Sequence, residues 1–169
     1  AMRVHLEEEH GVAVGELGYD SMTPEEDEVF AHQLVLAVEH DLPALVHTPH
    51  RDKLTGTRRT LDVVRESGLA PGRVLVDHLN EVTVGVVADS GCWMGFSIYP
   101  DTKMDPHRMV AILREHGTER MVVNSAADWG RSDPLLTVRT AEAMLAAGFD
   151  DDDVDRVLWR NPVEFYGQS

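Results

Sequence analysis

The sequence has 169 residues, which is the size of a single domain. Its 30 acidic residues outnumber 15 basic residues and give a net charge of −15, so the surface repels phosphate backbones and nucleic acid is excluded as a default partner. One cysteine, Cys92, excludes an internal disulfide and favours a reducing compartment. No membrane-spanning apolar run and no secretory signal pattern is present, so we predict a cytoplasmic protein with no membrane partner.

Short apolar runs alternate with helical patterns along the whole chain. Most of the runs are continuously apolar, which is typical of strands buried on both faces of a parallel sheet. The predicted strands lie at 12–14, 44–46, 74–76, 93–98 and 121–123. The predicted helices lie at about 23–38, 57–66, 81–87, 105–113 and 132–148, followed by two short helical segments at 150–158 and 161–165. Thr23, Asp105 and Asp133 each stand beside a proline at a predicted helix start, and acidic residues 150–153 begin a further helix.

Five consecutive strand–helix units predict an α/β fold with a parallel sheet and right-handed crossovers. The first three strands end near Glu16, His47 and His78, which are 31 residues apart at each step. This is the organisation of a parallel (β/α)8 TIM-barrel-type fold. A complete barrel needs about 200 to 250 residues. We therefore predict one partial barrel domain, residues 1–169, with five of the eight units.

The residues that can carry chemistry stand where the predicted strands end. In such barrels the active site lies at the carboxyl ends of the strands, so we expect Glu16, His47, His78 and Asp128 to converge. Imidazoles with carboxylates suit a divalent metal, with zinc as our first choice and manganese or iron as alternatives. Such an ion would activate a water molecule for hydrolysis. Asp77, Asn80 or Asp52 would hold the imidazole N–H groups.

Each candidate also has a purely structural interpretation. A single histidine at a strand end is more often a hydrogen-bonded structural residue than a ligand, but two histidines in successive units beside a glutamate favour a site. His50 follows the second strand and is either a substrate contact or a loop residue. Cys92 has no partner cysteine and precedes its strand, which indicates a buried thiol rather than a nucleophile.

Several motifs together resemble the TatD-like metal-dependent hydrolases of the amidohydrolase superfamily. Residues 11–20, G-V-A-V-G-E-L-G-Y-D, resemble the strand-four signature G-E-I-G-L-D of that family. Residues 43–47 resemble its strand-five P-x-x-x-H, residues 74–78 its strand six with a final histidine, and residues 161–165 its closing N-P-x-x-F turn. The resemblance implies a (β/α)8 barrel with one or two divalent metals. It also implies that Glu16 bridges metals and that His47 and His78 are metal ligands.

Two departures from the family pattern shape what the resemblance implies. The strand-eight E-T-D motif is replaced by N-S-A at residues 124–126, so the aspartate that is both ligand and general base would fall at Ala126. Asp128, two residues later, is our candidate for that catalytic role. The strand-one H-x-H pair is absent, which implies that the chain corresponds to strands four to eight.

The open sheet edges that result would pair with another chain. We therefore expect a homo-oligomer or a partner that supplies the missing strands. The leading function is a hydrolase that acts on an ester, amide or phosphoester bond of a small-molecule substrate. The alternatives are a non-catalytic scaffold or interaction subunit, and a TatD-like deoxyribonuclease.

Overall fold

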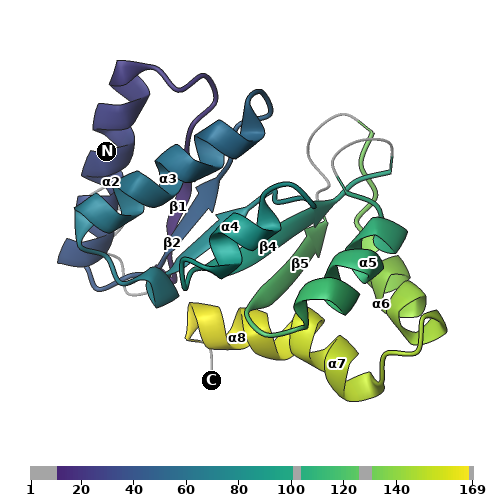
Figure 1. The fold of residues 1–169 in the computed structure, drawn as a ribbon. Helices are drawn as coiled ribbons and strands as arrows, with labels where there is room; N and C mark the ends of the chain where they lie inside the picture. Colours follow the sequence, from purple (N-terminus) through teal and green to yellow (C-terminus); the bar gives the residue numbers. More distant parts are fainter. Residues whose placement is uncertain (1–10, 101–103, 126–130, 168–169) are drawn as a thin grey trace.

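The computed structural model describes residues 11–100, 104–125 and 131–167, and these form one parallel sheet with helices on it (Figure 1). The strands lie in the order β1-β2-β3-β4-β5, and each pairs in parallel with its neighbour in sequence. Their bounds are β1 Val14–Gly18, β2 Ala44–His47, β3 Val74–Asp77, β4 Trp93–Ile98 and β5 Met121–Ser125. The predicted α/β class and parallel order are confirmed. The described sheet is open, with β1 and β5 at its edges.

Helices follow the strands in the predicted order. They are α2 Pro24–Glu39, α3 Lys53–Ser67, α4 Val84–Ala88, α5 Pro106–His116, α6 Leu136–Ala146, α7 Asp151–Asp155 and α8 Asn161–Tyr166, with a 3-10 turn at Pro71–Arg73 and a π-helical turn at Arg156–Arg160. Thr23 caps α2 at the predicted start, in a capping box with Glu26, and Asp105 and Asp150 cap α5 and α7 through their side chains. The predicted start of α6 is wrong: the helix begins at Leu136, without a side-chain cap. No helix in the described part of the chain is long and apolar enough to cross a bilayer.

The main core lies between the sheet and the helices, as expected for strands with helices packed on them. Phe30 and Leu34 of α2 and Met144 of α6 are fully buried there. Several apolar residues that follow the helical pattern are exposed: Val29, Val38, Leu135, Val138 and Leu145. The reason is that α2 and α6 flank the open sheet, so neighbouring elements cover only part of the apolar surface of each helix.

The opposite face of the sheet carries a second, smaller core. Alternation along the strands places Leu75, Trp93 and Val122 on this inner face, where they pack against Phe165 of α8. The Trp93 and Phe165 rings meet edge to face at 5.7 Å between centroids. In Figure 1 the yellow C-terminal helices lie against the end of the sheet near β5. We call this apolar layer the floor, because the polar residues at the strand ends lie directly above it.

Candidate metal centre

A layer of polar side chains lies on the inner face, one pleat beyond the apolar floor. Side chains of a strand point alternately to its two faces, so residues two positions after Leu45, Leu75 and Val122 return to the inner face. These are His47, Asp77 and Asn124. His47 pairs in register with Asp77, and Ser97 with Asn124. The carboxyl ends of β2, β3, β4 and β5 therefore bring one polar group each to a single mouth.

Glu16 reaches the same mouth from an irregular strand. The register between β1 and β2 shifts between Val14 and Leu17, so Glu16 lies in a bulge, and bulges re-aim side chains. Gly18 has φ +135°, and a Cβ there would fall 2.3 Å from the carbonyl oxygen of His47. Only glycine allows β1 to approach β2 this closely. The glycines that flank Glu16 thus let its carboxylate meet the histidines.

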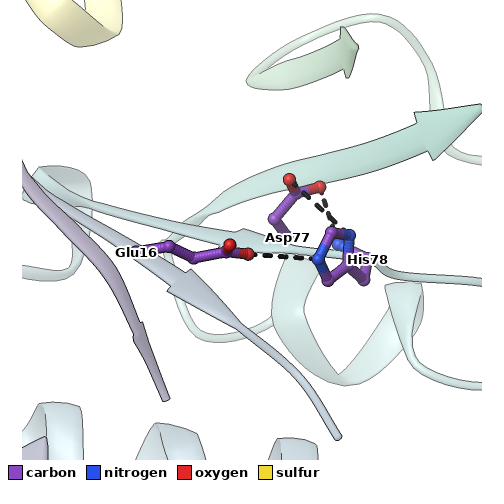
Figure 2. Close-up of side chains that lie close together, drawn as sticks. All are labelled: Glu16, Asp77 and His78. Carbon is purple, nitrogen blue, oxygen red and sulfur yellow. Dashed lines mark hydrogen bonds and ion pairs between the residues drawn. The ribbon is translucent and has the colours of Figure 1, made fainter. Parts of the chain in front are cut away.

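The Glu16 carboxylate lies between two imidazoles. Its Oε1 is 3.1 Å from Nε2 of His78 and 3.7 Å from Nδ1 of His47. Figure 2 shows Glu16 facing one nitrogen of the His78 ring, with Asp77 close to the same ring. Ligand atoms of Glu16, Asp77 and His78 all lie within 4.8 Å of one another, which is the one such group among the described residues.

This donor set fits a divalent metal ion. A deprotonated imidazole nitrogen that faces a carboxylate oxygen at 3.1 Å is repelled unless a proton or a cation lies between them. The Nε2 atom of His47 is buried without a hydrogen-bond partner and lies 3.7 Å from Asp20 Oδ1. Mixed nitrogen and oxygen ligands are those that zinc, manganese and iron accept.

His78 does not occupy the position equivalent to His47 that we expected from the 31-residue step. The register pairs His47 with Asp77, so His78 lies one residue beyond its strand. In a regular strand its side chain would point to the helix side of the sheet. His78 instead has φ +62°, an uncommon backbone conformation for a residue with a Cβ. This conformation returns its ring to the inner face, beside Asp77.

Asp77 is a buried carboxylate, only 4% exposed, with donors on both oxygens. The His78 backbone N–H donates to Oδ1 at 2.6 Å, and Asn124 Nδ2 donates to Oδ2 at 3.0 Å. Ser97 Oγ lies 3.3 Å from Oδ2 and 2.7 Å from His78 Nδ1. Asp77 thus lies behind His78 but is 3.8 Å from its Nδ1, so the predicted bond from an imidazole N–H to Asp77 is replaced by a contact through Ser97.

The remaining predicted residues are placed less directly. Asp128, with Ala126, lies outside the described residues. Asn80 does not hold an imidazole, because its side-chain oxygen accepts the Val82 N–H and shapes the turn before α4. Asp52 precedes α3 as its N-cap residue, in a left-handed conformation. His50 is exposed and lines the same hollow as Glu16 and His78, so its role as a substrate contact stays a prediction.

This hollow has a volume of about 610 Å³ and is open toward solvent. Its polar wall includes Glu16, His78, Ser97 and Asn124, and its floor includes Tyr166 of α8. Burial raises the pKa of the Tyr166 phenol, and the negative charge of Asp77 raises this pKa further. The phenol therefore stays protonated at neutral pH and adds no charge beneath the polar layer.

Comparison with known proteins agrees with the motifs and the geometry. The sequence profile of the family described as TatD related DNase matches residues 1–167. The chain belongs to this family. It is 26% identical over 161 residues to an uncharacterized metal-dependent hydrolase of Methanocaldococcus jannaschii, and the match covers 95% of this chain and 63% of that protein. The crystal structure of a TatD-like protein from Archaeoglobus fulgidus superimposes with a TM-score of 0.79 at 31% identity, over 98% of this chain and 64% of the other. This TatD-family chain thus spans less than two thirds of the length of both relatives.

Proposed function

We propose that this chain carries the metal-binding half of a hydrolase that acts on an ester, amide or phosphoester bond of a small molecule. The observation that carries the proposal is the Glu16 carboxylate placed between His47 and His78 at the mouth of the sheet. The relative from Methanocaldococcus jannaschii, described as a metal-dependent hydrolase, supports the same reading. Zinc is our first choice of ion. A bound divalent ion would act as a Lewis acid and lower the pKa of a water molecule.

In this proposal each residue of the site has a separate role. Glu16, His47 and His78 hold the ion, Asp128 adds a carboxylate and acts as general base, and His50 contacts the substrate from the rim of the hollow. The polar layer orients the ligands, and the apolar floor of Leu75, Trp93, Val122 and Phe165 excludes water from beneath them. A single buried cysteine, Cys92, supports a reducing, cytoplasmic location.

The metal is tested by isothermal calorimetry with Zn²⁺ on the purified chain. The wild type should bind, and a His47→Ala/His78→Ala double variant should lose most of the affinity because it removes both nitrogen ligands. A His32→Ala/His116→Ala variant is the matched control, since it removes two exposed histidines elsewhere. Equal affinity in all three proteins would replace the hydrolase proposal with the scaffold alternative.

The partner proposal follows from the open sheet. We propose that the five units are the last five of an eight-unit barrel, because their motifs resemble those of strands four to eight and because five eighths is close to the 63% and 64% of the relatives that the chain covers. The described strands β1 and β5 pair on one side only, and exposed apolar residues lie on the flanking helices: Val29, Val35 and Val38 on α2, and Leu135, Val138 and Leu145 at α6.

Such edges favour pairing with a second copy or with a segment that supplies three further strands. Light scattering should therefore find a species larger than a monomer. A monodisperse monomer would contradict this part of the proposal.

Deoxyribonuclease activity is the second candidate, and its support is the family description. Against it stands the net charge of −15, because phosphate contacts need clustered basic side chains. We expect no DNA binding by this chain at physiological salt. Micromolar binding with a steep dependence on salt concentration would show that expectation to be wrong.

A further inference from the structure

His78 offers its two ring nitrogens to different neighbours. Nε2 faces Glu16 at 3.1 Å, and Nδ1 lies 2.7 Å from Ser97 Oγ. A neutral imidazole carries one proton, so only one nitrogen can donate and the other is left with a lone pair. A metal ion at Nε2 needs that lone pair, which requires the proton to stay on Nδ1.

Asp77 decides which way the Ser97 hydroxyl can point. The Ser97 oxygen lies within hydrogen-bond distance of both carboxylate oxygens of Asp77, at 3.3 and 3.4 Å. An ionised carboxylate can only accept, so the serine must donate its single proton toward Asp77. The lone pairs of Ser97 Oγ then face His78 Nδ1 and can accept its N–H. This arrangement favours the tautomer that leaves Nε2 free to bind an ion.

The backbone of β4 leaves room for the contact between Ser97 and Asp77. A Cβ on Gly95 would fall 2.6 Å from Asp77 Oδ1 and 2.9 Å from its Cα, so only glycine leaves room for the Asp77 side chain against β4. Asn124 donates to Asp77 from β5 and fixes the carboxylate from the other side. Ser97 is itself buried, at 3% exposure, so its hydroxyl is largely shielded from water.

A direct role for Asp77 as a metal ligand is the rival reading. Asp77 does lie near Glu16, since ligand atoms of both carboxylates and of His78 are within 4.8 Å of one another, but its ion-pair distance to His78 is to Nδ1, at 3.8 Å, whereas Glu16 faces Nε2. Both Asp77 oxygens also accept bonds from a buried amide and a backbone N–H. The geometry therefore favours a carboxylate that acts through Ser97 over one that binds the ion.

We propose that Asp77 and Ser97 form a positioning pair that holds the proton of His78 on Nδ1 and so presents Nε2 as a metal ligand, an inference that rests on the proposed metal-dependent function. Residues that orient ligand histidines typically contribute about 10- to 100-fold to metal affinity. Neither residue touches the ion in this arrangement. Their effects should therefore depend on each other.

The first test is a double-mutant cycle on Zn²⁺ affinity, measured by competition with a chelator. Ser97→Ala and Asp77→Asn should each weaken binding by about 10- to 100-fold, and the double variant should be no weaker than the more affected single one. Ser97→Thr keeps the hydroxyl and should restore most of the affinity. Ser125→Ala is the matched control, because this serine lines the same hollow but donates to Pro134.

The second test reads the tautomer of His78 without any metal. Because Glu16 itself attracts a proton to Nε2 when no ion is bound, this test is made in a Glu16→Ala background, in protein labelled with ¹⁵N at histidine and kept at a pH where free imidazole is neutral. There, Ser97→Ala and Asp77→Asn should move His78 toward the tautomer with the proton on Nε2. The spectrum with Ser125→Ala should match that of the Glu16→Ala parent. Circular dichroism checks that each variant is folded. If Asp77→Asn does not fold, the ¹⁵N spectrum of Ser97→Ala alone decides this test.

The outcomes separate the inference from the function on which it rests. A large loss of affinity in Asp77→Asn with none in Ser97→Ala would make Asp77 a ligand and overturn the positioning pair. An unchanged His78 tautomer in Ser97→Ala would also overturn it, even if the wild type binds zinc. If the wild type binds no zinc, the proposed function fails, and the tautomer shift alone then supports or overturns the pair.

Discussion

Gly95 lies where strand β4 passes the Asp77 side chain, and the change Gly95→Ala tests how tightly this region is built. The added Cβ would meet Asp77 Oδ1 at 2.6 Å and the Asp77 Cα at 2.9 Å. The side-chain oxygen can move, but the Cα is backbone, so β3 and β4 must separate by several tenths of an ångström. Overpacking of this kind costs about 1 to 3 kcal/mol. We expect the free energy of unfolding to fall by that amount, measured by urea denaturation.

The control for this change is Gly85→Ala in α4. No atom lies within 4 Å of a Cβ at Gly85, and alanine is the better helix former. The same substitution should therefore raise the free energy of unfolding by about 0.5 to 1 kcal/mol. Gly95→Ala should also weaken Zn²⁺ binding, because it displaces Asp77, whereas Gly85→Ala should leave binding unchanged. Equal stability of the two variants would refute the close approach of Asp77 to β4.

Two further predictions concern an ion pair and the inner core. Arg108 donates to both oxygens of Glu81 at 2.8 and 2.7 Å, and these bonds lower the pKa of Glu81. The stabilisation, about 0.2 to 1 kcal/mol for so exposed a pair, is present above the unfolded-state pKa of Glu81 and is lost as the pH falls through its lower folded-state value. The difference in urea stability between wild type and Glu81→Gln should therefore shrink with falling pH; a constant difference would contradict the pairing. Trp93→Ala should cost about 3 to 5 kcal/mol in the same assay, because it empties the layer against Phe165 and removes the bond from Nε1 to the Gly72 carbonyl; a loss below 1 kcal/mol would place Trp93 outside the core.

The order of elements was readable from the sequence because local signals carry it. Apolar runs, most of them continuous, predicted all five strands, and the signals at Thr23 and Asp105 predicted helix starts that the structure confirms. Which apolar side chains of a helix are buried was harder to predict from the sequence. Leu135 and Val138 continue a helical pattern, yet both are exposed, since α6 buries Leu136 and Met144 instead. Periodicity indicates an apolar stripe but does not say whether a neighbour covers it.

The candidate site was predicted in outline because it depends on strand ends. Glu16, His47 and His78 each follow an apolar run, and the structure brings these three together. Ser97 and Asn124 were not singled out. A signal for them exists, because each lies two residues beyond a glycine or valine on the inner face, but alternation identifies the face only after the register between strands is known.

The geometry of His78 shows why the 31-residue spacing along the sequence does not predict the direction of its side chain. Asp77 and His78 are consecutive, and strict alternation would send their side chains to opposite faces of the sheet. The left-handed backbone at His78, φ +62°, costs about 1 to 2 kcal/mol for a residue with a Cβ. The bonds from the His78 N–H to Asp77 Oδ1 and between Nδ1 and Ser97 Oγ offset that cost. The same contacts that return the ring to the inner face thus also aim Nε2 at Glu16, so the strand end and the ligand orientation are one feature of the fold.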